Sequence, residues 1–259
     1  MASVQRIFVL SAVTLCFQLT QSWSIPGLKG GLQRVLDKRF MAHKRDVALE
    51  VPKIARGNML PMDATFETLD KDGQVARVST PDVFCGKKVV VVTMPAAFSP
   101  MCSSKHLPSY LRANDRGFFS AQGVDTVAIL TTDSPHTLSE WVKSVRGAMA
   151  EEESKVDVVD IAGMQKGPPC DVLLLSDTKG DFCRATGLEL DNTKFACDMP
   201  HFARTAFFVS DGKVKMMLEE SADNYCGLTG AENMLAEGLG CKDKAIFIAL
   251  AGEFGLMSS

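Results

Sequence analysis

The residues best suited to chemistry lie in the segment 89–111, VVVVTMPAAFSPMCSSKHLPSYL. Its apolar start predicts a buried strand, and the residues that follow predict a turn and then a helix with Cys102 near its first turn. A free thiol with a pKa of about 8.5 is mostly protonated at neutral pH, but the unpaired N–H groups at a helix start stabilise the thiolate. Because the thiolate is the nucleophilic form, the segment predicts a reactive cysteine at Cys102.

The neighbours of Cys102 carry groups that suit such a thiol. Pro95 would form a rigid wall beside the sulfur, and Ser99 offers a hydroxyl to a bound substrate. Each also has a simpler interpretation, since Pro95 can end the strand and Ser99 can cap the helix. His106 follows Cys102 by four residues and lies on the same helix face. A metal site on Cys102 and His106 would lack the further ligands that it needs.

Hydrophobic periodicity and turn signals predict the strands and helices that position these residues. Strands alternate with helices and then form a hairpin at Asp211-Gly212, which predicts an α/β sandwich with a mixed central sheet flanked by helices. We expect strands within 60–70 and at 74–80, 89–93, 125–130, 172–175, 205–209 and 213–218. We expect helices at 103–119 with a break at Gly117, and at 137–145, 181–186 and 230–239. Residues 151–153 and 167–169 are interpreted as parts of a long solvated connection.

The N-terminal residues have the pattern of a targeting leader. Residues 1–24 have a positive start, a short apolar run and a small-x-small cleavage site, which is typical of a secretory signal. Residues 25–46 are basic and amphipathic like a transit peptide, with a flexible basic linker as the alternative. Together they resemble the bipartite leaders of plastids reached through the secretory route. We expect such an organelle, with secretion or a mitochondrion as alternatives.

Composition indicates a globular protein. The chain has 259 residues, of which 46% are hydrophobic and 23% charged. We expect one domain over 47–241 and a C-terminal tail over 242–259. The net charge of -3 gives no sign of nucleic-acid binding, and no apolar run is long enough to predict a membrane span.

The cysteines are irregularly spaced and include no CxxC pair. Eight occur, at Cys16, Cys85, Cys102, Cys170, Cys183, Cys197, Cys226 and Cys241. With Cys16 in the leader, an odd number remains, which argues against a disulfide framework and against a third candidate role, a secreted disulfide-rich ligand. A structural zinc site would need close ligand pairs. Most of these cysteines therefore fit the role of small buried apolar residues.

The run PAAFSPMCSSKHLPSY resembles the active-site signature of the peroxiredoxins and is most similar to that of the peroxiredoxin-5 or type II branch. The resemblance continues through GVDTVAILTTD, LLLSDTKGDF and RTAFFVSDGKV, and covers residues from about 60 to 240. It implies a thioredoxin-like fold and a thiol-dependent peroxidase for hydrogen peroxide and alkyl hydroperoxides, with peroxynitrite as a further candidate. It also implies that no metal or organic cofactor is required.

The resemblance assigns roles to four residues. Cys102 would attack the terminal oxygen of a peroxide and become a sulfenic acid. Ser99 would hydrogen-bond to the peroxide, and Pro95 would shield the sulfur from water and over-oxidation. Arg204 matches the active-site arginine, which would stabilise the thiolate and the transition state.

The remaining roles are less defined. His106 is expected to line the pocket or to support it, and Met101 departs from the small or polar residue that is usual there. Cys226 is a candidate to resolve the sulfenic acid, with Cys183 and Cys197 as lesser candidates. The other option is a one-cysteine cycle, in which glutathione, glutaredoxin or thioredoxin attacks the sulfenic acid.

The expected partners are a peroxide and such a thiol reductant, and a homodimer is compatible with the resemblance. An alternative function is a non-catalytic thioredoxin-fold redox sensor or partner-binding protein. In that case Cys102 would pass its oxidation to a bound protein instead of turning over.

Overall fold

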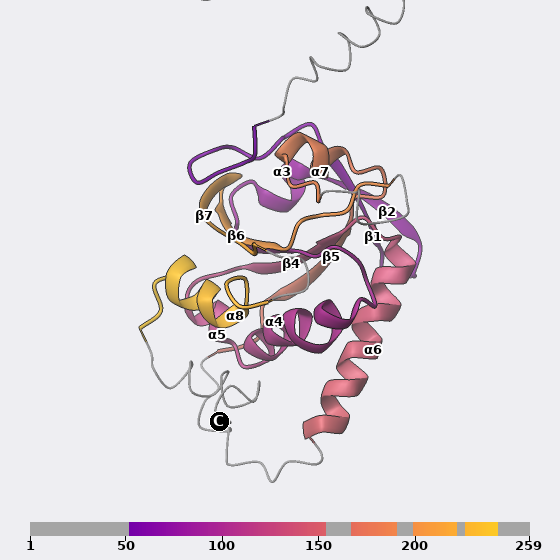
Figure 1. Cartoon of the computed structure of the whole chain (residues 1–259), viewed down its shortest axis with the longest axis vertical. Coiled ribbons are helices and arrows are strands. Elements are labelled where there is room, and N and C mark those ends of the chain that lie inside the picture. The colour runs from indigo at the N-terminus through magenta and orange to yellow at the C-terminus, as the bar shows by residue number, and fades with distance from the viewer. Residues whose placement is uncertain (1–51, 154–166, 191–198, 222–225, 243–259) are drawn as a thin grey trace, which may run out of the picture. The chain divides into compact units, whose positions relative to one another are not determined.

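The computed structural model describes residues 52–153, 167–190, 199–221 and 226–242 (Figure 1). Within them, seven strands form one sheet in the order β2-β1-β5-β4-β3-β6-β7. The strands are β1 (Thr65–Leu69), β2 (Val75–Ser79), β3 (Lys88–Thr93), β4 (Thr126–Thr131), β5 (Asp171–Ser176), β6 (Thr205–Ser210) and β7 (Lys213–Glu219). The pairings of β4 with β3 and β5 are parallel, and the others are antiparallel. The predicted α/β fold with a mixed central sheet is therefore confirmed.

Helices cover both faces of this sheet (Figure 1). They are α3 (Thr80–Phe84), the π-helical turn η1 (Cys102–His106), α4 (Leu107–Asp115), α5 (Phe118–Ala121), α6 (Pro135–Glu153), α7 (Asp181–Thr186), α8 (Ala231–Asn233) and the π-helical turn η4 (Met234–Gly238). In Figure 1, α3 and α7 lie on one side of the sheet, whereas α4, α5, α6 and α8 lie on the other. Across the described ranges, no helix is both long and apolar enough to span a membrane.

The valine run in β3 is explained by its burial on both faces. Side chains alternate between the two faces of a strand. Val90 and Val92 pack in the cluster that holds Cys102 and α4, and Val89 and Val91 pack in a second cluster on the opposite face. Because helices cover both faces, the strand is continuously apolar instead of alternating.

One helix was not predicted from the sequence, and one predicted connection is wrong. The predicted strand 74–80 ends at Ser79, where a capping box between Ser79 and Asp82 starts α3, with proline in its first turn. Residues 151–153 belong to α6, not to a connection. Glutamate is a good helix former, and Glu152 accepts a hydrogen bond from Nη2 of Arg112 at 2.7 Å, which ties the end of α6 to α4.

Several sequence predictions lie outside the described residues. They are the signal at 1–24, the transit-like segment at 25–46, the domain start at 47, Cys197, and the tail beyond Lys242.

Gly117 breaks the predicted helix at the expected position. Its φ of +68° is in the left-handed region, and α5 begins directly after it. A Cβ atom at this position would lie 2.0 Å from the carbonyl oxygen of Gly167. Glycine is thus required both by the backbone conformation and by the close approach of a second backbone segment.

Gly117→Ala should lower the free energy of unfolding more than Gly86→Ala does. Gly86 has the same φ of +68°, but nothing lies within 4 Å of a Cβ placed there. Both variants incur the left-handed strain of about 1–2 kcal/mol, and only Gly117→Ala adds a backbone clash. Urea unfolding of both variants measures the difference. Equal losses would show that the approach of Gly167 imposes no constraint.

Candidate active site

The end of β3 and the start of β6 fix the backbone around Arg204. Thr93 pairs with Thr205 across the two strands. The Thr93 hydroxyl donates to the carbonyl of Ala203 at 2.7 Å and accepts the N–H of Thr205 at 3.1 Å. The carbonyl of Arg204 accepts the N–H of Glu220 at 3.1 Å. These bonds hold the residues on both sides of Arg204 and thereby set the point from which its side chain extends.

The loop between β3 and the helix is held by two other segments. Pro95 is buried, and its carbonyl accepts a hydrogen bond from Nδ1 of His201 at 2.9 Å. Asp133 accepts the N–H of Ala97 at 2.7 Å. Phe98 has a φ of 58°, which is rare for a bulky residue. Such strain persists only where the surroundings enforce it, and it is concentrated at functional sites.

Cys102 lies in the first part of the helix, within the π-helical turn η1. The helix begins at Pro100, where the missing N–H costs nothing, and the N–H of Leu107 donates to the carbonyl of Cys102. Nε1 of the buried Trp141 donates to the Ser103 hydroxyl at 2.9 Å and ties the turn to α6. Single π-helical turns occur frequently at functional sites.

Arg204 brings two of the predicted site residues together. Its Nη1 lies 3.2 Å from Sγ of Cys102 and 3.1 Å from Nδ1 of His106. Cys102 and His106 have no exposed surface, and Arg204 is 2% exposed. One guanidinium nitrogen carries two hydrogens, so it can donate to both acceptors. A charged donor at the sulfur in a water-poor site stabilises the thiolate.

His106 has a defined protonation state in this arrangement. Its Nε2 lies 3.1 Å from the carbonyl of Thr229, which can only accept, so Nε2 carries the hydrogen and Nδ1 is free to accept from Arg204. Burial, followed by the positive charge of Arg204, lowers the pKa of His106 to about 3, although the bond to Thr229 acts in the opposite direction. His106 is therefore neutral and accepts a hydrogen bond from Arg204. This contact is a supporting one, and the sequence led us to expect that His106 lines or supports the pocket.

The Ser99 hydroxyl donates its hydrogen to an earlier residue of the same loop. Its Oγ donates to the carbonyl of Ala96 at 3.0 Å, which leaves the oxygen lone pairs to accept from a bound molecule. Met101 directly precedes Cys102 in the helix and is half-buried. Ser99 therefore lies in the loop that leads into the helix, and Met101 lies within the helix itself.

Cys226 shares the electrostatic surroundings of Cys102. It is half-buried, and burial raises the pKa of its thiol to about 12, with Glu220 adding to the rise. The charge of Arg204 and a hydrogen bond with Thr229 lower that pKa. Because Arg204 contacts the Cys102 sulfur and its charge also reaches the Cys226 thiol, Cys226 itself lies near the site.

Cys183 has different surroundings. It is buried in the apolar cluster on the face of the sheet opposite to that of Cys102, and burial raises its pKa. The six cysteines of the described ranges are free thiols. In the same ranges no group of three or more His, Cys, Asp or Glu side chains is arranged to hold a metal ion.

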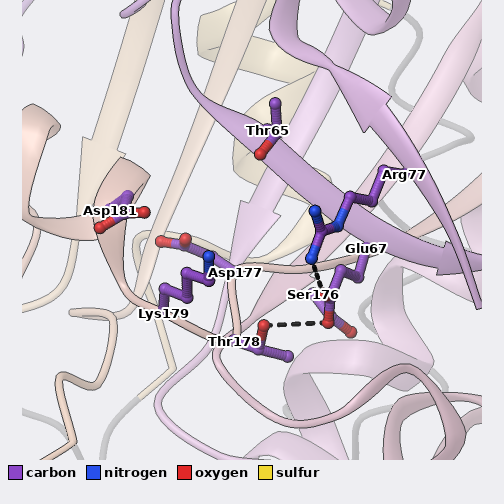
Figure 2. Close-up of a pocket in the computed structure, with 8 residues that line it drawn as sticks. All are labelled: Thr65, Glu67, Arg77, Ser176, Asp177, Thr178, Lys179 and Asp181. Carbon is purple, nitrogen blue, oxygen red and sulfur yellow. Dashed lines mark hydrogen bonds and ion pairs between the residues drawn. The ribbon is translucent and has the colours of Figure 1, made fainter.

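A polar hollow lies away from Cys102, around β1, β2 and the start of α7 (Figure 2). Glu67 accepts a hydrogen bond from the Thr178 hydroxyl at 3.0 Å and pairs with Arg77 at 3.7 Å. Asp177 accepts the N–H of Cys183 at 2.7 Å and so supports α7. The hollow contains none of the predicted site residues, and these contacts give it a structural role.

Sequence reasoning missed the residues that support the site. Asp133 lies in the run GVDTVAILTTD, but that run gave it no role. The roles of Thr229, Glu220 and Trp141 depend on contacts that only the folded chain forms. The one available signal was a carboxylate, Glu220, directly after an apolar strand.

The neutral state of His106 predicts a pH-dependent stability. Its pKa is about 3 in the folded chain and 6.5 without the fold, so its contribution is complete above about pH 6.5 and is lost as the pH falls towards 3. From pH of about 7 to about 5.5 this residue should account for about 1 kcal/mol of lost stability. His106→Gln should lose less over this range than the wild type does. His136→Gln, at an exposed histidine, is the control, and equal pH dependence in all three proteins would contradict the assignment.

Comparison with known proteins agrees with this geometry. The redoxin family model matches residues 55–235. Peroxiredoxin-2F, mitochondrial, from Arabidopsis thaliana is 30% identical over 193 residues, which are 71% of this chain and 84% of that protein. Peroxiredoxin-2E-2, chloroplastic, from Oryza sativa subsp. japonica is 31% identical over 187 residues, 71% of this chain and 72% of that protein.

A solved structure is also similar. Reduced Prx3 from Vibrio vulnificus in complex with hydrogen peroxide aligns with a TM-score of 0.56 at 27% identity, over 71% of this chain and 98% of that chain. These matches agree with the buried cysteine beside an arginine. The chain therefore belongs to the redoxins and is a peroxiredoxin of the peroxiredoxin-5/type II kind, a thiol peroxidase.

Proposed function

We propose that the Cys102 thiolate attacks the terminal oxygen of hydrogen peroxide or an alkyl hydroperoxide. The S–O bond forms as the O–O bond breaks, the departing oxygen takes up a proton and leaves as water or alcohol, and Cys102 becomes a sulfenic acid. The observation that carries this proposal is the 3.2 Å contact from Nη1 of Arg204 to Sγ of Cys102 inside a buried site. The Vibrio vulnificus Prx3 complex with hydrogen peroxide supports the choice of substrate.

Three neighbours assist this step in the proposal. The guanidinium of Arg204 stabilises negative charge on the sulfur and on the peroxide oxygens as the bond breaks. Ser99 accepts a hydrogen bond from the peroxide, since its own hydrogen is donated to Ala96. Pro95, buried two residues after β3, limits the access of water to the sulfur. The cycle requires no metal or organic cofactor.

An external thiol then returns Cys102 to its reduced form. Either it attacks the sulfenic acid directly and releases water, or Cys226 does so first and forms a disulfide with Cys102. In both routes two thiols are oxidised for each peroxide reduced. Glutathione with glutaredoxin, or thioredoxin, has the required chemistry. Since burial raises the pKa of the Cys226 thiol to about 12, the second route needs this thiol to lose its proton as it attacks.

Cys102→Ser should abolish peroxide turnover with excess reductant, because a hydroxyl is a far weaker nucleophile than a thiolate. Cys85→Ser removes an exposed thiol outside the site and should keep the wild-type rate. Steady-state consumption of hydrogen peroxide with thioredoxin or glutaredoxin measures both. Activity that survives in Cys102→Ser, or a wild type that stops after one equivalent as a redox sensor would, contradicts the proposal.

Cys226→Ser separates the two reduction routes. If Cys226 resolves, wild type treated with one equivalent of peroxide loses two hydrogens in non-reducing mass analysis, whereas the variant accumulates a sulfenic acid that dimedone traps. If the cycle uses one cysteine, both proteins give the sulfenic acid and keep the same turnover.

We also propose that the protein works in an organelle reached through the secretory route, the plastid first. Residues 1–46 support this with a signal-like and a transit-like part, and the relatives named above are mitochondrial and chloroplastic. A fluorescent protein fused after residues 1–46 should reach the plastid, whereas a fusion with 25–46 alone should stay outside the secretory route. Secretion of the first fusion would contradict the proposal.

A further inference from the structure

Glu220 is a buried carboxylate that holds the segment before α8. It directly follows β7 and is 8% exposed. Its Oε1 accepts three hydrogen bonds, from the N–H of Thr229 at 2.7 Å, the N–H of Gly227 at 2.8 Å and the hydroxyl of Thr229 at 3.0 Å. One oxygen atom therefore fixes both the backbone and the side chain of Thr229.

Thr229 passes this constraint to the active site. Its carbonyl accepts hydrogen bonds from Nε2 of His106 at 3.1 Å and from the Tyr110 hydroxyl at 2.7 Å. Nδ1 of the same histidine meets Nη1 of Arg204, which contacts the Cys102 sulfur. A continuous series of hydrogen bonds thus leads from Glu220 through Thr229 and His106 to Arg204.

We propose that Glu220 is a positioning residue of the peroxide site, which acts on Arg204 by fixing Thr229 and, through it, the tautomer of His106. A glutamate side chain suits this task, because one oxygen of its carboxyl group accepts all three hydrogen bonds. The backbone adds a second link, since the N–H of Glu220 donates to the carbonyl of Arg204 at 3.1 Å.

The tautomer explains how a distant carboxylate affects the sulfur. While the Thr229 carbonyl stays in place, the hydrogen of His106 is kept on Nε2 and Nδ1 can accept from Arg204. If that carbonyl moves, the hydrogen can shift to Nδ1. Two N–H groups then face each other, and the guanidinium is pushed away from both His106 and Cys102. The expected result is a less stable thiolate with no change at Cys102 itself.

The chain offers a matched control in the preceding residue. Glu219 is the last residue of β7, and its carboxylate pairs with Lys53 at the surface. Glu220→Gln and Glu219→Gln each remove one charge at adjacent positions. Only the first replaces the acceptor that holds Thr229.

The test combines three measurements on the full-length variants. The first is the tautomer of His106 from its ring ¹⁵N shifts. The second is the pH profile of iodoacetamide alkylation at Cys102, measured by mass analysis of its peptide. The third is the single-turnover rate with hydrogen peroxide. We expect Glu220→Gln to show the Nδ1–H tautomer, an alkylation profile moved to higher pH and a rate lower by about tenfold. Glu219→Gln should match the wild type in all three.

A purely structural role for Glu220 would lower the melting temperature and leave the tautomer and the alkylation profile as in the wild type, which would overturn the inference. If Glu220→Gln does not fold, Thr229→Val decides, since it removes the side-chain bonds of Thr229 to Glu220 and to Cys226 but keeps its backbone bond to Glu220, and it should move the same readouts less far. Wild-type readouts in Thr229→Val would then overturn it.

The inference rests on the proposed function only through the role of Arg204. If the wild type lacks peroxidase turnover, that function fails, while the tautomer and the alkylation profile still decide the role of Glu220.

Discussion

The buried guanidinium of Arg204 is the constraint on which the site depends. A permanent charge with 2% exposure is costly unless its donors find acceptors. Nη1 finds two of them, the Cys102 sulfur and Nδ1 of His106. An anionic sulfur satisfies this charge better than a neutral thiol does. The contact that makes the burial of Arg204 tolerable therefore also places a permanent positive charge at the Cys102 sulfur.

A neutral histidine is well suited to share Arg204 with the cysteine. A carboxylate in the place of His106 would attract the guanidinium strongly and compete with the sulfur for it. An imidazole that accepts through Nδ1 directs the guanidinium without neutralising its charge. The Thr93 contacts hold the backbone beside Arg204, and Thr229 holds the histidine, so both ends of this arrangement are fixed by the sheet and its loops.

The sequence predicted the features that local chemistry determines. Apolar runs located the strands, Gly117 marked the break after α4, and the resemblance selected Cys102, Ser99, Pro95 and Arg204. Local signals were also overlooked, because the Ser79–Asp82 capping box announces α3 in the sequence itself. The π-helical turn at Cys102 and the contacts of Glu220 with Gly227 and Thr229 have no sequence signature. The bond from His106 to Thr229 could not be predicted either, since it joins segments that are far apart in the chain.

The central claim is that Arg204 makes the buried sulfur of Cys102 reactive towards peroxide. Its most direct test is the rate at which Cys102 forms a sulfenic acid with hydrogen peroxide, measured across pH in the wild type and in Arg204→Gln. The account predicts a rate lower by roughly a hundredfold in the variant, and a rise in rate that occurs only at higher pH. Equal rates and equal pH profiles in the two proteins would contradict it.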